Sequence, residues 1–241
     1  MAGHSHWKSI KHKKAVVDAR RGKAWSKLAR LIIIAAKRGA NPDDNLALRY
    51  SIDKARAANM PNDTIDKAIK RGSGELSGVN YEQVNYEGYG PGGVAILVDA
   101  LTDNRNRTAG EIRMAFDKAG GAVGAANSVG WMFTKRGVIA IERGEVEEER
   151  LMELSLDAGA EDVQTSDEGY TVITSVADFE RVRKAVEGAK IPMVSAELVM
   201  TPSQSVAAGG AQAAAVQKLI EALEDHDDVQ NVYTNAEFAE E

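Results

Sequence analysis

Residues 138–200 read VIAIERGEVEEERLMELSLDAGAEDVQTSDEGYTVITSVADFERVRKAVEGAKIPMVSAELVM. Short runs of β-branched residues alternate in this stretch with patterns that have helical periodicity. The expected elements are strand 138–141, helix 146–158, strands 162–166 and 170–175, helix 179–188 and strand 193–200. This βαββαβ order is the split βαβ arrangement of α+β domains. The sequence therefore predicts a complete α+β domain over residues 135–204.

The residues on both sides of this domain supply a second set of elements in two pieces. Strands are expected at 84–87, 94–101 and 129–133, and a helix is expected at 105–119. One helix and one strand are then missing, and residues 213–223 and 229–233 have the patterns that would supply them. We therefore predict a discontinuous α+β domain over residues 79–134 and 205–241, into which residues 135–204 are inserted.

Three helical patterns precede these domains. The first is expected over residues 21–38, the second begins after the capping candidates Asp43 and Asp44 and reaches residue 58, and the third begins at Asn62 or Asp63. Lys70, Arg71 and Gly72 are expected to end the third helix. The next residues, as far as Gly78, have the composition of a linker. The sequence therefore predicts a three-helix domain over residues 1–78.

The charge of the chain is divided unevenly. Residues 1–72 contain 17 of the 30 Lys and Arg residues but only six of the 36 Asp and Glu residues, so this segment carries a net charge of +11. The remaining residues carry −17, although the whole chain carries only −6. A basic segment attracts polyanions, whereas an acidic one is repelled by them. The charge therefore indicates that nucleic acid binds to the N-terminal domain.

Composition excludes several other classes of protein. The chain has no cysteine, which excludes a disulfide framework and zinc sites built on thiolates. Its longest apolar run, 31–36, lies between Arg30 and Lys37 and is too short for a membrane span or a signal sequence. We expect a cytoplasmic protein.

Basic residues with one aromatic neighbour define the candidate nucleic-acid surface. On the first helix, Lys23, Lys27 and Arg30 lie opposite the apolar face. The candidate residues are Trp7, Lys8, Lys11, His12, Lys13, Lys14, Arg20, Arg21, Lys23, Lys27 and Arg30, with Lys70 and Arg71 as an extension. Phosphates attract the cations and a base can stack on Trp7. The alternative is a solvated basic face that binds no partner.

Arg105 and Arg107 form a second candidate patch between a strand and a helix. Together with Thr108 they could bind an anion. A capped turn whose arginines pair with acidic neighbours explains the same residues equally well. The sequence leaves both interpretations open.

No spacing of residues indicates a catalytic or metal-binding group. His4, His6 and His12 lie in the basic N-terminal segment, and His226 lies in the acidic run 224–228. The glycine-rich turn 90–93 lacks the lysine spacing of a phosphate-binding loop and is interpreted as a hairpin turn. We therefore predict a protein that is not an enzyme and uses no cofactor, metal or small-molecule substrate.

Five successive segments resemble the signature blocks of the YebC/PmpR family. They are GHSHWKSIKHKKAVVDARRGK (3–23), ANMPNDTIDKAIKRGSG (58–74), YEGYGPGGVAILV (86–98), TDNRNRTAGEIRMAFDKAGG (102–121) and VGWMF (129–133). The resemblance implies an α+β protein of three domains, in which an N-terminal helical domain precedes two ferredoxin-like domains, one inserted into the other. It also implies a cytoplasmic, non-enzymatic regulator of gene expression whose basic residues bind nucleic acid. The sequence departs from the family pattern at 31–34 and at 125–127, where the family more usually has polar residues.

The resemblance leaves two targets open. Family members are described as DNA-binding transcriptional regulators, while mitochondrial relatives are translational activators of cytochrome c oxidase and bacterial members have been linked to ribosomes. The three helices show no recognition helix rich in Asn, Gln and Arg, which a duplex-DNA reader would need. A basic segment with one aromatic residue suits irregular ribosomal RNA. Neutralising six phosphates gives a log–log salt slope of about −5 for either target.

Charge reversal at the basic candidates tests the predicted surface. Replacing Lys13, Lys14, Arg20, Arg21, Lys23 and Lys27 by Glu is expected to abolish nucleic-acid binding, because each change replaces an attraction for phosphate by a repulsion. Binding is measured by fluorescence anisotropy, and circular dichroism establishes that the variant is folded. A folded variant that keeps its affinity would contradict the assignment.

Overall fold

The computed structural model describes residues 21–238, except for the side chain of Arg21. The described chain divides into two compact units: residues 21–129 and 209–234 form one, and residues 130–208 and 235–238 form the other. Among the described helices, none is long and apolar enough to cross a lipid bilayer.

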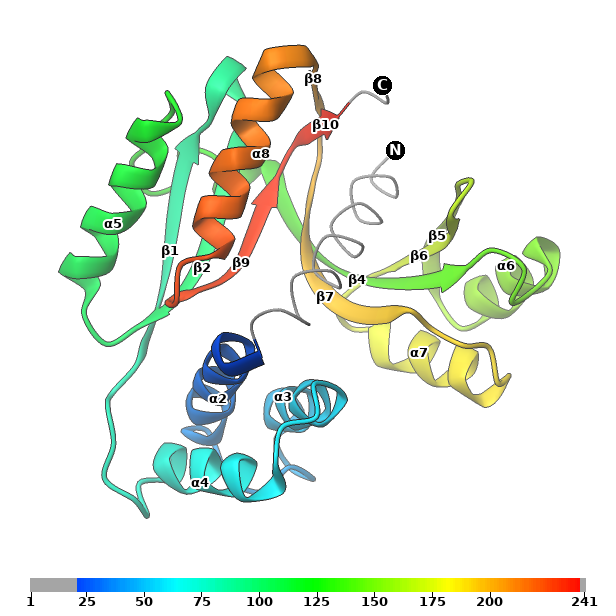
Figure 1. Cartoon of the computed structure of the whole chain (residues 1–241). Coiled ribbons are helices and arrows are strands. Elements are labelled where there is room, and N and C mark those ends of the chain that lie inside the picture. The colour runs from blue at the N-terminus through cyan, green and yellow to red at the C-terminus, as the bar shows by residue number, and fades with distance from the viewer. Residues whose placement is uncertain (1–20, 239–241) are drawn as a thin grey trace. The chain divides into compact units, whose positions relative to one another are not determined.

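Three helices form the N-terminal part of the first unit (Figure 1). They are α2 (Arg21–Ala36), α3 (Leu46–Ala57) and α4 (Asn62–Ser73), close to the ranges predicted from the sequence. α2 packs against both of the others, and the shared core includes Ile32, Leu48, Ile52 and Ile65. The three-helix prediction is confirmed.

The start of α3 differs from the prediction. Asn45, not Asp43 or Asp44, is the N-cap, and its side-chain oxygen accepts a hydrogen bond from the backbone N–H of Leu48 at 3.1 Å. The amide nitrogen of the same side chain donates to the carbonyl oxygens of Ala35 and Gly39 at 2.8 and 2.7 Å. An amide both accepts and donates, so Asn45 caps α3 and satisfies carbonyls at the end of α2, which an ionised Asp cannot do.

The ends of α4 also differ. Pro61 is the N-cap, and neither Asn62 nor Asp63 makes a capping hydrogen bond. The helix continues through Gly72 to a C-cap at Gly74, whose φ of 86° is left-handed. A Cβ atom on Gly72 would lie 2.4 Å from the carbonyl oxygen of Ile33 and 2.6 Å from the Cβ of Ala36. Gly72 is therefore the point at which α4 approaches α2 and not the end of the helix.

The first unit continues with a four-stranded antiparallel sheet. Its strand order is β3-β1-β2-β9, with β1 at Glu82–Tyr89, β2 at Ala95–Thr102, β3 at Ala122–Val123 and β9 at Val229–Thr234. Helices α5 (Arg105–Lys118) and α8 (Gly210–Glu224) lie side by side on the sheet (Figure 1). The C-terminal helix and strand thus complete this domain as predicted.

The strand predicted at 129–133 is wrong. Residues Gly130–Met132 form a 3-10 turn, and the third strand of the sheet is the two-residue β3, which pairs with Gly88 and Tyr89 of β1. Residues Gly124 and Val129, between β3 and this turn, are held on β1 by hydrogen bonds to Glu87. A strand of two residues is too short to leave a periodic signal in the sequence.

The inserted domain has the predicted βαββαβ order. Its elements are β4 (Phe133–Glu142), α6 (Glu148–Asp157), β5 (Ala160–Thr165), β6 (Gly169–Thr174), α7 (Phe179–Gly188) and β7 (Ser195–Pro202). The sheet order β5-β6-β4-β7, antiparallel throughout, is that of a ferredoxin-like domain. A parallel pair that the sequence did not predict joins β8 (Val206–Ala208) to β10 (Ala236–Phe238). The domain ranges 1–78, 79–134 with 205–241, and 135–204 stay predictions.

The close packing of Gly72 predicts that replacing it by alanine destabilises the protein, although alanine favours helix formation. Gly→Ala inside a helix ordinarily stabilises by about 1 kcal/mol. Gly72→Ala is expected to destabilise by about 1–3 kcal/mol in urea unfolding, because the new methyl group collides with α2. Gly110→Ala in α5 is the control, because no heavy atom would lie within 4 Å of its new Cβ. Equal stabilisation by both substitutions would show that α2 and α4 are not in close contact.

Candidate nucleic-acid interface

The structure describes only part of the predicted nucleic-acid surface. Trp7, Lys8, Lys11, His12, Lys13, Lys14 and Arg20 lie outside the described residues, as does the side chain of Arg21. The described candidates are Lys23, Lys27 and Arg30 on α2, Lys70 and Arg71 on α4, and Arg105 and Arg107 on α5. Their assignment to nucleic-acid binding stays a prediction.

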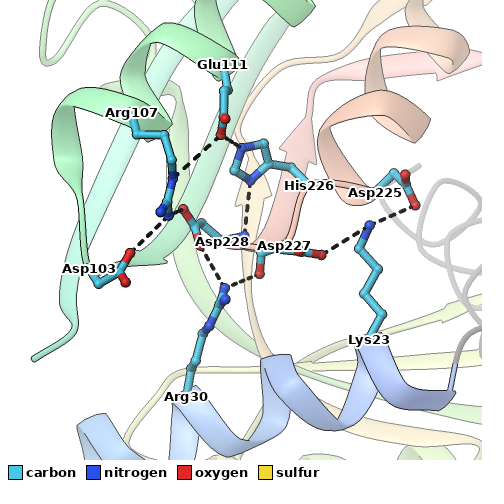
Figure 2. Close-up of a pocket in the computed structure, with 9 residues that line it drawn as sticks. All are labelled: Lys23, Arg30, Asp103, Arg107, Glu111, Asp225, His226, Asp227 and Asp228. Carbon is cyan, nitrogen blue, oxygen red and sulfur yellow. Dashed lines mark hydrogen bonds and ion pairs between the residues drawn. The ribbon is translucent and has the colours of Figure 1, made fainter. Parts of the chain in front are cut away.

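The basic stripe of α2 faces an acidic turn between α8 and β9. Lys23 Nζ lies 3.3 Å from a carboxylate oxygen of Asp225 and 3.2 Å from one of Asp227. Lys27 Nζ donates to the carbonyl oxygen of Glu224 at 2.6 Å. Figure 2 shows that Lys23 and Arg30 both point from α2 into this turn. Three predicted phosphate contacts are thus occupied by the chain itself.

Asp228 is the centre of the contact. Its side chain is 2% exposed, and its carboxylate accepts hydrogen bonds from Arg30 at 2.8 Å, from Arg107 at 2.6 Å and from the hydroxyl of Thr108 at 2.7 Å. Burial raises the pKa of this carboxyl, but the hydrogen bonds from Thr108 and Arg107 and the charges of Arg30 and Arg107 outweigh burial and hold the pKa below its ordinary value. Asp228 is therefore a buried anion at neutral pH.

His226 connects the turn to α5. Its Nδ1 accepts the backbone N–H of Asp228 at 3.1 Å, so the neutral ring carries its proton on Nε2 and can donate to Glu111 at 2.7 Å. Arg107 lies 3.9 Å from the same carboxylate and 3.0 Å from that of Asp103. These groups line a pocket of about 430 Å³ (Figure 2). The described residues include no cluster of His, Asp or Glu arranged to hold a metal ion.

Lys27 lies between Lys23 and Arg30 on the stripe and is half-buried. Burial is the main cause that lowers its pKa from 10.5 to about 8, and the charge of Lys23 acts in the same direction. Glu224 and Asp227 oppose this effect. Partial burial therefore disfavours the charged form of Lys27, so this lysine attracts a phosphate less than a fully exposed lysine would.

The second candidate patch is a capped turn. Asn104 is the N-cap of α5, and its side-chain oxygen accepts from the backbone N–H of Arg107 at 3.1 Å. The side chain of Arg107 pairs with Asp103 and Asp228, as the alternative interpretation expected, whereas Arg105 is exposed. Both arginines are exposed, with 43% of the Arg107 side chain accessible, but Arg107 is paired with carboxylates.

A different group of cations is exposed where the ends of α2 and α4 converge. Arg38 follows α2, and Lys70 and Arg71 lie in the last turn of α4. All three are exposed, and none forms an ion pair with another described residue. The close approach of Gly72 to Ala36 brings these two helix ends together. The sequence prediction missed Arg38, which lies just beyond the last helical turn of α2.

Models of one protein family match nearly the whole chain. The model described as TACO1/YebC protein N-terminal domain matches residues 5–75, and the model described as TACO1/YebC second and third domain matches residues 81–236. The two matched segments meet at residues 76–80, in the connection between α4 and β1.

Individual relatives match at similar length. A "Probable transcriptional regulatory protein" of Clostridium tetani is 53% identical over 100% of this chain and 99% of its own. One of the same name from Natranaerobius thermophilus is 52% identical over 98% of this chain and 96% of its own. The crystal structure of a conserved hypothetical protein from Aquifex aeolicus is similar with a TM-score of 0.87, at 46% identity over 98% of both chains.

Replacing the buried anion tests its part in stability. Asp228→Asn is expected to lower the free energy of unfolding by about 2–3 kcal/mol at pH 7, because two arginines lose their shared anion. Since the folded pKa lies below the ordinary 3.8, this stabilisation is present above pH 3.8 and is lost as the pH falls through the folded value. The free energies of unfolding of the wild-type and Asp228→Asn proteins should therefore converge at acid pH.

Asp227→Asn is the control, because the side chain of Asp227 is exposed, and it should change the free energy of unfolding by less than about 1 kcal/mol. Equal effects of the two substitutions would contradict the role of Asp228.

Proposed function

Because the chain belongs to the TACO1/YebC family, we propose that it regulates gene expression by binding nucleic acid through its basic N-terminal domain, without catalysis. Its relatives are named probable transcriptional regulatory proteins, which supports a regulator and names no reaction. We further propose that the protein acts in the cytoplasm and that neither a membrane nor a small-molecule substrate is among its partners.

The exposed cations at the converging ends of α2 and α4 carry this proposal. Arg38, Lys70 and Arg71 have no carboxylate partner among the described residues, so their full charge is available to phosphates. They belong to the segment 1–72, whose net charge is +11. Release of counterions from a nucleic acid by such groups supplies affinity that does not depend on sequence.

Duplex DNA is one candidate target, since the relatives are named transcriptional regulatory proteins, but the surface of α4 argues against insertion of this helix into the major groove. Asp63 and Asp66 are exposed on its first two turns, and a recognition helix would bring that end close to phosphates. Binding through the backbone is therefore the mode that the described residues support. Folded ribosomal RNA is the second candidate target, because cations at the ends of two helices can follow an irregular backbone.

Reversing the exposed cations tests the surface. Lys70→Glu with Arg71→Glu is expected to weaken binding to a labelled DNA duplex and to an RNA hairpin by about tenfold or more, and to reduce the log–log salt slope by about 2. Arg113→Glu with Lys118→Glu on α5 makes the same change in charge at exposed positions and also replaces a cation in the last turn of a helix.

Equal losses in both variants would overturn the proposed surface and leave only an effect of net charge. If the protein binds neither probe at low salt, the proposed function itself is wrong. Tighter binding of the duplex than of the hairpin would support DNA as the target, and the reverse order would support RNA.

A further inference from the structure

The acidic turn Glu224–Asp228 covers one face of α2 in a regular way. The cations at 23, 27 and 30 follow helical spacing, and each meets the turn: Lys23 meets the carboxylates of Asp225 and Asp227, Lys27 meets the carbonyl of Glu224, and Arg30 meets Asp227 and Asp228. Figure 2 shows the carboxylates of Asp225 and Asp227 directed at Lys23. The turn thus presents anionic and carbonyl oxygens to a stripe of cations, as a phosphate backbone would.

The two ends of this contact differ in strength. Asp228 is buried and bound by groups from α2 and α5, so its pair with Arg30 belongs to the folded core. The side chains of Asp225 and Asp227 are 47% and 67% exposed. Exposed ion pairs contribute little to stability and weaken in salt. The pairs at Lys23 can therefore exchange with external phosphates while the pair at Arg30 keeps the turn in place.

We propose that the turn Glu224–Asp228 is an autoinhibitory phosphate mimic, which withholds Lys23 from nucleic acid until phosphates displace Asp225 and Asp227. This inference rests on the proposed function. It divides the basic groups into two sets: Arg38, Lys70 and Arg71 make the first contact, and Lys23 joins only when the carboxylates of Asp225 and Asp227 give way. Weak, non-specific binding of a polyanion is then disfavoured, because its phosphates do not replace the ion pairs that Lys23 loses with Asp225 and Asp227.

Removing the two exposed carboxylates tests the mimic. Asp225→Asn with Asp227→Asn is expected to tighten binding to the labelled DNA duplex or RNA hairpin by about fivefold at low salt, since two exposed ion pairs no longer compete. The salt slope should become steeper by about 1, because the newly available Lys23 engages one further phosphate. Asp157→Asn with Asp167→Asn is the matched control, because both side chains are exposed, lie in the other compact unit and make the same change in net charge.

Two more measurements separate the mimic from a general effect of charge. In a Lys23→Met background the gain from the turn substitutions should shrink, because the cation that they release is absent. Without any nucleic acid, labelling by an amine-reactive ester should increase at Lys23 in the turn variant and stay unchanged at Lys70, because the two substitutions remove the carboxylates that pair with Lys23.

The outcomes distinguish this inference from the proposed function. If the wild-type protein binds and the turn variant binds no more tightly than the matched control, the inference is overturned and the proposed function stands. If neither protein binds either probe, the proposed function fails and the inference falls with it. A gain that persists unchanged in the Lys23→Met background also overturns the inference.

Discussion

The buried carboxylate of Asp228 is the interaction on which the arrangement of residues 21–129 and 209–234 depends. It accepts hydrogen bonds from Arg30 of α2 and from Arg107 and Thr108 of α5, and it lies itself in the turn before β9. A buried anion costs several kcal/mol unless hydrogen-bond donors compensate it. The turn that carries Asp228 is therefore stable in this position only when α2 and α5 supply those donors. The helical part of this unit is therefore held by a buried charge as well as by the chain connection 74–81.

This constraint also sorts the cations of the N-terminal domain. Lys23, Lys27 and Arg30 lie against the acidic turn because Asp228 holds that turn beneath α2, whereas Arg38, Lys70 and Arg71 lie beyond its reach. A cation that is already neutralised gains little from a phosphate, since one ion pair only replaces another. The net charge of a segment is thus a poor guide to which of its residues bind a polyanion.

Much of the fold could be predicted because it depends on neighbouring residues. The helix at 179–188 coincides with α7, and the βαββαβ order and the completion of the first sheet by α8 and β9 follow from periodicity. The errors arise where a segment distant in the sequence determines the local structure. Asn45 is the cap of α3 and also donates hydrogen bonds to carbonyls at the end of α2. Gly72 lies inside α4 because α2 is too close there to leave room for a side chain. The strand β3 is too short to be periodic.

The sequence by itself determined the helices, most of the strands, the α+β class and the concentration of positive charge in residues 1–72, because all of these are properties of residues close together in the chain. Only the tertiary structure decided which of those charges are paired. Lys27 and its partner Glu224 are 197 positions apart, and no local pattern connects them. Ion pairing depends on distance in space, which packing sets, and not on separation along the chain.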